Sequence, residues 1–363
     1  MTGDEYMNDR KKVGLLTYHH TTNFGSLLQT YALYKTVENL GFVCEIVDYR
    51  NAVVEAREFI KRVYQCKGIR ELKNHLQYGR YKKIKAKEFF KFINDEFRIS
   101  KSIYYKDNIA EANNDYDYFL VGSDLVWDFS INNHDTTYML DFVSEEKHKI
   151  AYASSVGEVW QGHDKELVVS LLNRFASIGV REQAICDALQ NELDIPVDFV
   201  CDPTMLYDPI EWDEMSDIRL IDKDYILCYM SDDNLTIYSD AVQYGKKHGL
   251  PVFLISYGWV PDNMIPIRPY KIGEFLSLIK YANTVFTASY HGMLFSLYFK
   301  KNFYYYNRGW KARMESIAAY LNVGSREHWT GKDAEPLDYQ KIIHKILGLR
   351  EQSIEKLNSY LQK

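Results

Sequence analysis

The chain has 363 residues, of which 46% are hydrophobic and 26% charged; this is an ordinary globular composition, and the length favours two domains. With 44 Lys and Arg against 50 Asp and Glu, the formal net charge is −6, which argues against nucleic-acid binding because phosphate backbones favour an excess of cations. No run of ~20 apolar residues predicts a membrane span, and the polar opening MTGDEYMNDRKK does not resemble a signal peptide.

The five cysteines are odd in number and widely spaced, and none forms a C-x-x-C pair. Cys44, Cys201 and Cys228 lie in apolar, strand-like runs, as reduced core thiols do. We therefore expect a cytoplasmic protein. Histidines do not cluster with carboxylates or cysteines at ligand spacing, so we expect no metal. The first loop lacks a G-x-G-x-x-G fingerprint, and nothing implies a redox cofactor.

The first half of the chain is typical of a parallel α/β sheet. A strand over 13–18, a helix over 26–40 ended by Gly41, and a strand over 43–48 form an opening β–loop–α–β unit. A charged, amphipathic stretch from residue 51 to about 112 shows no strand pattern and predicts a helical insertion. Further strands are expected at Tyr118–Val121, Lys149–Ala153, Ser177–Val180 and Phe199–Cys201.

The α/β pattern restarts after residue 207. Strands are expected over 225–230, 251–256, 284–287 and 303–306, with helices over 234–248, 273–281, 291–300 and 337–361. The sequence thus predicts two Rossmann-like domains. The first covers 12–207 and contains the insertion, and the second covers 208–363 and contains the terminal helices.

Ligands of open parallel sheets bind beyond the carboxyl ends of the strands. At the first such junction, Asn23 and Gly25 precede a helix whose N–H groups attract anions, with simple helix capping as the alternative. At the second junction, Gly122 permits a sharp turn. Asp124 and Trp127 that follow are suited to binding a sugar, because a carboxylate accepts from hydroxyls and an aromatic face packs on the sugar ring. The alternative there is a capping Asp with a buried Trp.

The third junction places Arg181 directly after a strand, where a guanidinium can clamp a carboxylate or phosphate, or instead pair with Glu182 or another acid. The fourth, within VFTASYHGMLFSLYF, places His291 at a helix start before Gly292. A histidine in this position suits a general acid or base near neutral pH. The Asp202-Pro203 step between these junctions is more typical of a turn.

Taken in order, the segments GLLTYHHTTNFGSLLQTYAL, VGSDLVW, AYASSVG, GVREQ, CDPTMLYD and TASYHGMLFSLYFKKNF resemble the polysaccharide pyruvyl transferase family. That resemblance implies a GT-B-like fold, in which two Rossmann-like domains face a cleft. It also implies transfer of a pyruvyl group from phosphoenolpyruvate to two hydroxyls of a sugar as a ketal. The sugar would belong to a capsular, cell-wall or exopolysaccharide unit, or to its lipid-linked oligosaccharide precursor.

The resemblance also assigns roles to individual residues. His291 matches the His-Gly motif as acid or base, and Arg181 matches the family arginine as anion clamp. The remaining substrate-binding candidates are Asn23, Gly25 and Gln29 of the opening motif, Asp124 and Trp127 on the acceptor side, and Ser289, Tyr290 and Gly292 around the histidine.

The chain departs from the family pattern at one position. Some members carry an arginine directly before the His-Gly pair, whereas this chain has Tyr290, as in a Ser-Tyr/Phe-His-Gly branch. Arg313 or Arg308 would then supply the missing charge, and His19 or His20 would be a further source.

Two other functions stay open at this point: a GT-B-type glycosyltransferase using a nucleotide sugar, and a non-catalytic sugar-binding scaffold, which would tolerate His291→Ala. A lipid-linked acceptor would bring the protein to the inner face of the membrane. The charged helical segment over 54–91 is the expected place of peripheral contact. Self-association into a homo-oligomer is also left open.

Overall fold

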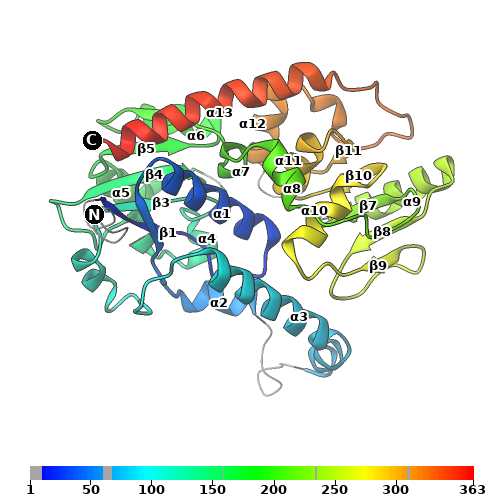
Figure 1. Cartoon of the computed structure of the whole chain (residues 1–363), viewed down its shortest axis with the longest axis horizontal. Helices are drawn as coiled ribbons and strands as arrows, with labels where there is room; N and C mark the ends of the chain where they lie inside the picture. Colours follow the sequence, from blue (N-terminus) through cyan, green and yellow to red (C-terminus); the bar gives the residue numbers. More distant parts are fainter. Residues whose placement is uncertain (1–9, 60–67, 158, 234, 309–310) are drawn as a thin grey trace, which may run out of the picture. The chain divides into compact units, whose positions relative to one another are not determined.

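The computed structural model describes residues 10–59, 68–157, 159–233, 235–308 and 311–363. The chain divides into two compact units (Figure 1). The first unit consists of Met1–Phe59, Phe90–Tyr207 and Leu347–Lys363, and the second consists of Ile60–Phe89 and Asp208–Ile346.

The first unit contains a six-stranded sheet in the order β2-β1-β3-β4-β5-β6, and every neighbouring pair is parallel. Its strands are β1 (Lys12–Leu16), β2 (Val43–Ile46), β3 (Tyr118–Val121), β4 (His148–Ser154), β5 (Ser177–Val180) and β6 (Val197–Phe199). The chain runs outward from β1 to β2 and then returns through β3 to β6. A right-handed crossover therefore places α1 on the opposite face from α5 and α6.

The helices of this unit connect the strands as the α/β pattern requires. They are α1 (Phe24–Asn39), α2 (Ala52–Glu58), α4 (Phe129–Asn132), α5 (Gly162–Leu172), α6 (Gln183–Gln190) and α7 (Pro203–Leu206), with 3₁₀ turns η2 (Ile109–Asn114) and η3 (Thr136–Met139). Asn23 caps α1, and Gly41 beyond its end has φ +94°, a value that favours glycine.

The second unit contains a parallel sheet in the order β11-β10-β7-β8-β9. Its strands are β7 (Ile226–Tyr229), β8 (Val252–Ile255), β9 (Ile265–Ile267), β10 (Thr284–Thr287) and β11 (Asn302–Tyr305). Its helices are α8 (Pro209–Met215), α9 (Thr236–His248), α10 (Ile272–Lys280), α11 (Tyr290–Tyr298) and α12 (Lys311–Leu321), with the 3₁₀ turn η4 (Gly324–Arg326). The predicted α/β architecture with two parallel sheets is confirmed.

Two long helices belong to both units. Helix α3 (Ile69–Glu96) is the main part of the predicted insertion, but its residues up to Phe89 group with the second unit. Helix α13 (Tyr339–Leu361), predicted with the second domain, groups with the first unit from Leu347 onward. The contacts explain this, because Lys356 and Tyr360 both donate to the Asp198 carboxylate of β6.

Local sequence explains the most enclosed helix of the second unit. Every residue of α11 (YHGMLFSLY) is buried, and a helix that is apolar on all sides is typically a core helix. Trp212 of α8 packs edge-on against Phe295 of α11, with ring centroids 5.3 Å apart. The first turn of α11, which contains His291, is therefore held in a fixed place at the end of β10.

Candidate functional site

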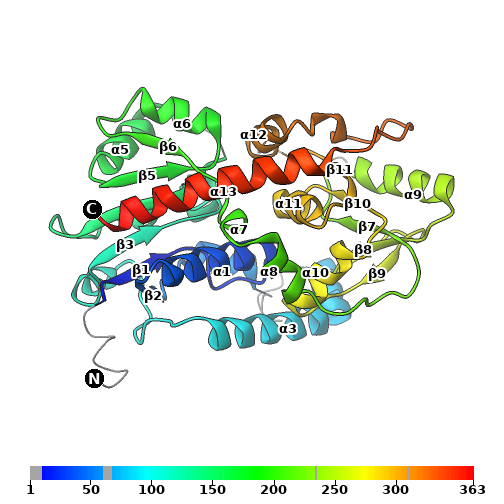
Figure 2. The same cartoon turned by 45° about the horizontal axis from the view of Figure 1, so that its top comes forward.

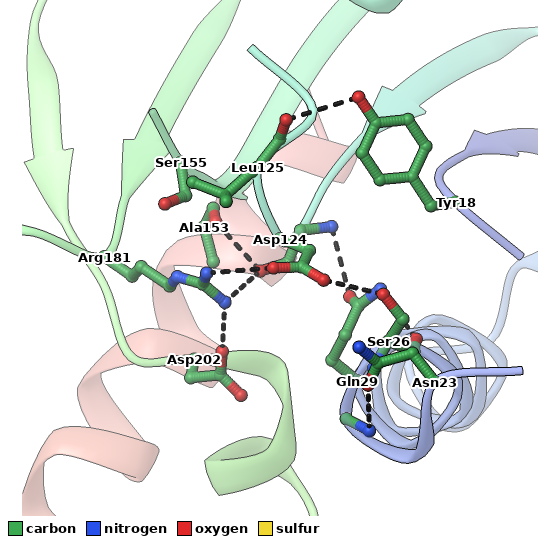
Figure 3. Close-up of polar contacts among 12 residues, drawn as sticks. Tyr18, Asn23, Ser26, Gln29, Asp124, Leu125, Ala153, Ser155, Arg181 and Asp202 are labelled. Carbon is green, nitrogen blue, oxygen red and sulfur yellow. Dashed lines mark hydrogen bonds and ion pairs between the residues drawn. The ribbon is translucent and has the colours of Figure 1, made fainter. Parts of the chain in front are cut away.

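In the first unit, the loops that follow β3, β4 and β5 meet at one sheet edge (Figure 3). Gly122 has φ +151°, and a Cβ added there would lie 1.9 Å from the Tyr152 carbonyl oxygen. Only glycine fits, so the chain turns sharply and presents Ser123 and Asp124. The Asp124 carboxylate, whose side chain is 17% exposed, accepts a 2.6 Å hydrogen bond from the Ser26 hydroxyl at the start of α1.

Arg181 lies beneath this loop and is enclosed by acidic groups. Its side chain is 1% exposed, and its guanidinium contacts Asp202 at 2.5 Å, Glu182 at 3.3 Å and Asp124 at 3.5 Å. It also donates to the Ser123 hydroxyl at 3.0 Å. Three carboxylates thus lie within 3.5 Å of one guanidinium. Of the two roles that the sequence left open for Arg181, the structure shows the pairing with Glu182 and other acids of the same chain.

The opening motif is bonded to the same loop. The Asn23 side chain accepts from the Gly25 and Ser26 N–H groups, which is the arrangement of a helix cap. Gln29 is fully buried, and its carbonyl oxygen accepts from the Ser123 N–H at 3.2 Å while its amide donates to the Thr17 hydroxyl at 3.1 Å. Gln29 thus connects the ends of β1 and β3 to α1.

Trp127 has no exposed surface, and its indole N–H donates to the Tyr138 carbonyl at 2.9 Å. Its ring packs near Trp160 and Phe175, so its faces are covered by protein. Trp127 is therefore a buried core residue, which was the second of the two alternatives that the sequence left open. It supports the Asp124 loop from inside the core.

The two histidines of the first loop lie against a separate acidic group. The His19 ring contacts the Asp48 carboxylate at 3.0 Å, and His20 contacts Glu55 at 2.6 Å and stacks on Phe90. Burial raises the pKa of Asp48, but hydrogen bonds from His19 and Arg50 outweigh it and lower that pKa to about 2. His19 is buried and His20 is half-buried, so neither is a freely exposed loop residue.

In the second unit, His291 lies in the first turn of α11, directly beyond β10. Ser289 caps the helix by accepting from the Gly292 N–H at 3.2 Å, and its own N–H donates to the Thr287 hydroxyl at 3.0 Å. A Cβ added at Gly292 would lie 2.4 Å from the Thr287 Oγ1, so only glycine allows this close approach. Tyr290 and His291 are both 6% exposed, with ring centroids 5.4 Å apart.

Cationic residues follow the neighbouring strand at the same edge of this sheet. Strand β11 pairs in parallel with β10, and the chain continues from it through Asn307 to Arg308. Arg308 and Arg313 of α12 are both half-buried, while Gly309 and Trp310 between them lie outside the described residues. This edge also contains Glu327, which accepts from the Asn307 amide at 2.8 Å.

The structure thus gathers the predicted residues into two groups. Asn23, Gly25, Gln29, Asp124 and Arg181 form the Asp124 group with four partners that sequence reasoning had not assigned to a site: Ser26, Ser123, Glu182 and Asp202. The His291 group consists of Ser289, Tyr290, His291 and Gly292. The signals that could have identified two of them are the position of Ser123 just after a strand and that of Ser26 in the first turn of a helix.

A family model described as polysaccharide pyruvyl transferase matches residues 23–309, a range that contains both groups in full, whereas Arg313 lies outside it. The chain belongs to the polysaccharide pyruvyl transferase family. This assigns it to a family of transferases, while the Ser-Tyr/Phe-His-Gly branch stays a prediction. Among curated proteins, none matches the sequence of this chain.

Solved structures similar to this family member show the same fold at low identity. The UDP-GlcNAc 2-epimerase of Neisseria meningitidis bound to UDP-GlcNAc is 11% identical, with a TM-score of 0.56 over 96% of this chain and 94% of that one. A putative UDP-N-acetylglucosamine 2-epimerase of Listeria monocytogenes is 11% identical, with a TM-score of 0.54 over 96% and 91%. An Anabaena protein in complex with UDP and glucose is 9% identical, with a TM-score of 0.52 over 96% and 100%. The predicted GT-B-like fold is confirmed.

Three further features concern membrane-spanning helices, metal sites and cysteines in the described residues. No helix in the described part of the chain is long and apolar enough to cross a membrane. Nor do His, Cys, Asp or Glu gather there in groups of three or more that could hold a metal ion. Cys44, Cys186, Cys201 and Cys228 are buried free thiols, and burial raises the pKa of Cys201 to about 12, whereas Cys66 lies outside the described residues.

Proposed function

We propose that this chain transfers the pyruvyl group of phosphoenolpyruvate to two hydroxyls of a saccharide, giving a cyclic ketal and inorganic phosphate. The observation that supports this most directly is the family match over residues 23–309, joined to the placement of His291. That histidine is held by a capped helix start beyond a parallel strand, beside the strand that leads to Arg308.

The proposed chemistry uses His291 as the proton donor. The protonated imidazole gives its proton to the methylene carbon, which makes C2 electrophilic, and a sugar hydroxyl attacks C2. The bond from C2 to the phosphate oxygen then breaks, and the second hydroxyl closes the ketal. Of the two hydroxyl protons, one ends on the new methyl group through His291 and the other on phosphate.

The charges of the two groups favour different substrates. Phosphoenolpyruvate is an anion with a carboxylate and a phosphate, so it suits the edge where β11 leads to Arg308, with Arg313 of α12 as a second candidate cation. Three carboxylates already contact the Arg181 guanidinium, so this group is less suited to an anionic donor than to hydroxyl groups, which can donate to Asp124. We therefore propose that Asp124 serves the acceptor and that Arg181 positions Asp124, in place of the clamp role expected from the family.

Calorimetric titration with phosphoenolpyruvate tests this assignment. We expect saturable binding that weakens in Arg313→Ala and Arg308→Ala and is largely kept in His291→Ala. Arg219→Ala, which removes an arginine of the same unit paired with Asp224, is the control and should bind normally. Binding of UDP-glucose without any binding of phosphoenolpyruvate would instead support a nucleotide-sugar glycosyltransferase. Binding of neither ligand, with or without saccharide, would favour the scaffold alternative.

The acceptor pathway stays a prediction. A capsular, cell-wall or exopolysaccharide unit, and a lipid-linked oligosaccharide that would bring the protein to the inner membrane face, are all compatible with a transferase that ketalises a sugar diol. Reaction without a cofactor, self-association and a cytoplasmic location likewise remain predictions.

A further inference from the structure

A cavity of about 490 Å³ lies within the second unit and is lined by residues of α3 and of the segment from Gly258 to Arg268. Figure 2 labels α3 and the strands β8 and β9, to which these residues belong or are adjacent. Sites for small molecules typically measure about 300–1,000 Å³. The side chains that matter for its chemistry are Gln77, Tyr78 and Tyr81 of α3, and Trp259, Asp262 and Arg268 of the β8–β9 region. The cavity thus joins aromatic rings with an amide, a carboxylate and a guanidinium.

The β8–β9 loop presents Trp259 to solvent in an ordered turn. The Ser256 hydroxyl accepts from the Gly258 N–H at 3.1 Å and donates to the Trp259 carbonyl at 3.2 Å. Trp259 is 64% exposed, although a tryptophan side chain gains most from burial. The loop is attached to α3, since the Lys85 ammonium lies 4.3 Å from the Tyr257 ring centroid.

Arg268 and Tyr81 are arranged as a pair in the wall of this cavity. The guanidinium carbon lies 4.2 Å from the Tyr81 ring centroid, so it covers one face of the ring. The Arg268 Nε is buried and has no hydrogen-bond partner within the described part of the chain. Buried N–H groups usually have a partner, so this donor is suited to a ligand oxygen. Arg80 fixes the other end of Tyr81 by donating to its hydroxyl at 2.5 Å.

The charges of the lining identify the class of ligand. Arg268 and Asp262 are the only charged side chains among the residues that line the cavity in the described structure, and their formal charges cancel. A phosphorylated ligand would require an excess of cations, and an apolar ligand would leave the amide and both charges desolvated. A neutral sugar satisfies both conditions, because its hydroxyls donate and accept while its C–H faces pack on aromatic rings.

We infer that this cavity is a binding subsite for a neutral saccharide chain, separate from the Asp124 and His291 groups. Identifying that saccharide as part of the acceptor rests on the proposed function, but its binding does not. The subsite would hold sugar units that are not themselves ketalised.

A glycan array probed with the full chain, followed by calorimetry with the best neutral oligosaccharide, tests the inference. Trp259→Ala should weaken the measured affinity about tenfold, and Trp259→Phe should restore most of it. Arg268→Ala should also weaken binding. Tyr105→Ala removes a 51% exposed aromatic ring of the first unit and should leave binding unchanged.

Several outcomes would overturn the subsite. They are the absence of any glycan binding on the array, binding that is unchanged in Trp259→Ala and Arg268→Ala, and selection of only phosphorylated or polyanionic glycans. If the protein floats with vesicles only when Trp259 is present, and binds no glycan, this face of the second unit contacts a membrane instead. If glycan binding persists while phosphoenolpyruvate fails to bind, the proposed function fails and the subsite stands. If phosphoenolpyruvate binds while no glycan does, the subsite fails and the proposed function stands.

Discussion

The Asp124 group and the His291 group occupy equivalent places in their own units, beyond the carboxyl ends of parallel strands, yet their electrostatics differ. In the first, Arg181 is surrounded by Asp124, Glu182 and Asp202 within 3.5 Å. In the second, the helix start at His291 lies beside a strand that leads to Arg308. An arginine at a strand end is therefore not by itself evidence of an anion site, because the fold can surround it with carboxylates.

The largest effect is expected for His291→Ala, because loss of a general acid typically lowers rates about 10²–10⁴-fold. Pyruvyl transfer should fall by that factor, whereas thermal unfolding and donor binding should change little. The control is His163→Ala, whose side chain is 91% exposed in the first unit. A His291→Ala variant with normal turnover would contradict the acid role of this residue.

Arg181→Ala should act mainly on stability. Removing one partner of a buried ion pair costs about 3–5 kcal/mol, since the carboxylates of Asp202 and Glu182 remain buried without their cation. Urea unfolding should show this loss, and Arg219→Ala, whose ion pair with Asp224 is exposed, should show much less. Unchanged stability together with lost phosphoenolpyruvate binding would contradict our assignment and return Arg181 to the clamp role.

Gly292→Ala tests how closely the start of α11 must approach β10 in the second unit. The added Cβ would lie 2.4 Å from the Thr287 Oγ1, so we expect a cost of about 1–3 kcal/mol and a displaced His291. Gly348→Ala in α13 is the matched control, because nothing lies within 4 Å of its added Cβ. Thermal unfolding of the two variants in parallel measures the difference, and equal unfolding midpoints would show that the α11 start adjusts freely.

The smallest expected effect concerns Asp48, and it depends on pH. Its pKa falls from 3.8 to about 2 on folding, which corresponds to about 2 kcal/mol of stability in favour of the ionised form. That contribution is fully present above pH 4 and is lost as the pH falls through about 2. Asp48→Asn should therefore be less stable than wild type at pH 7 and nearly equal to it at pH 2. A pH-independent difference in urea unfolding would mean that packing, not charge, is responsible.

By itself, the sequence determined the α/β class, the two parallel sheets and most strand positions. Strands β3, β5 and β10 were predicted with their observed bounds, because short apolar runs between polar turns are local signals. The four junctions with chemical character were also located correctly at strand ends. Strand β9 was missed, since Ile265–Ile267 is short, mostly exposed and interrupted by Pro266, as an edge strand can be.

Only the tertiary structure decided what those junctions contain. Arg181 meets Asp124 across 57 positions and Asp202 across 21, and Trp127 meets the Tyr138 carbonyl inside the core. The same holds for α3 and α13, whose residues 69–89 and 347–361 group with units distant in the chain. Periodicity reports which residues are buried along one element, but the partner of a buried charge is set by packing between elements. For that reason the sequence located the strand-end junctions, and only the fold shows that three carboxylates surround Arg181 at one of them.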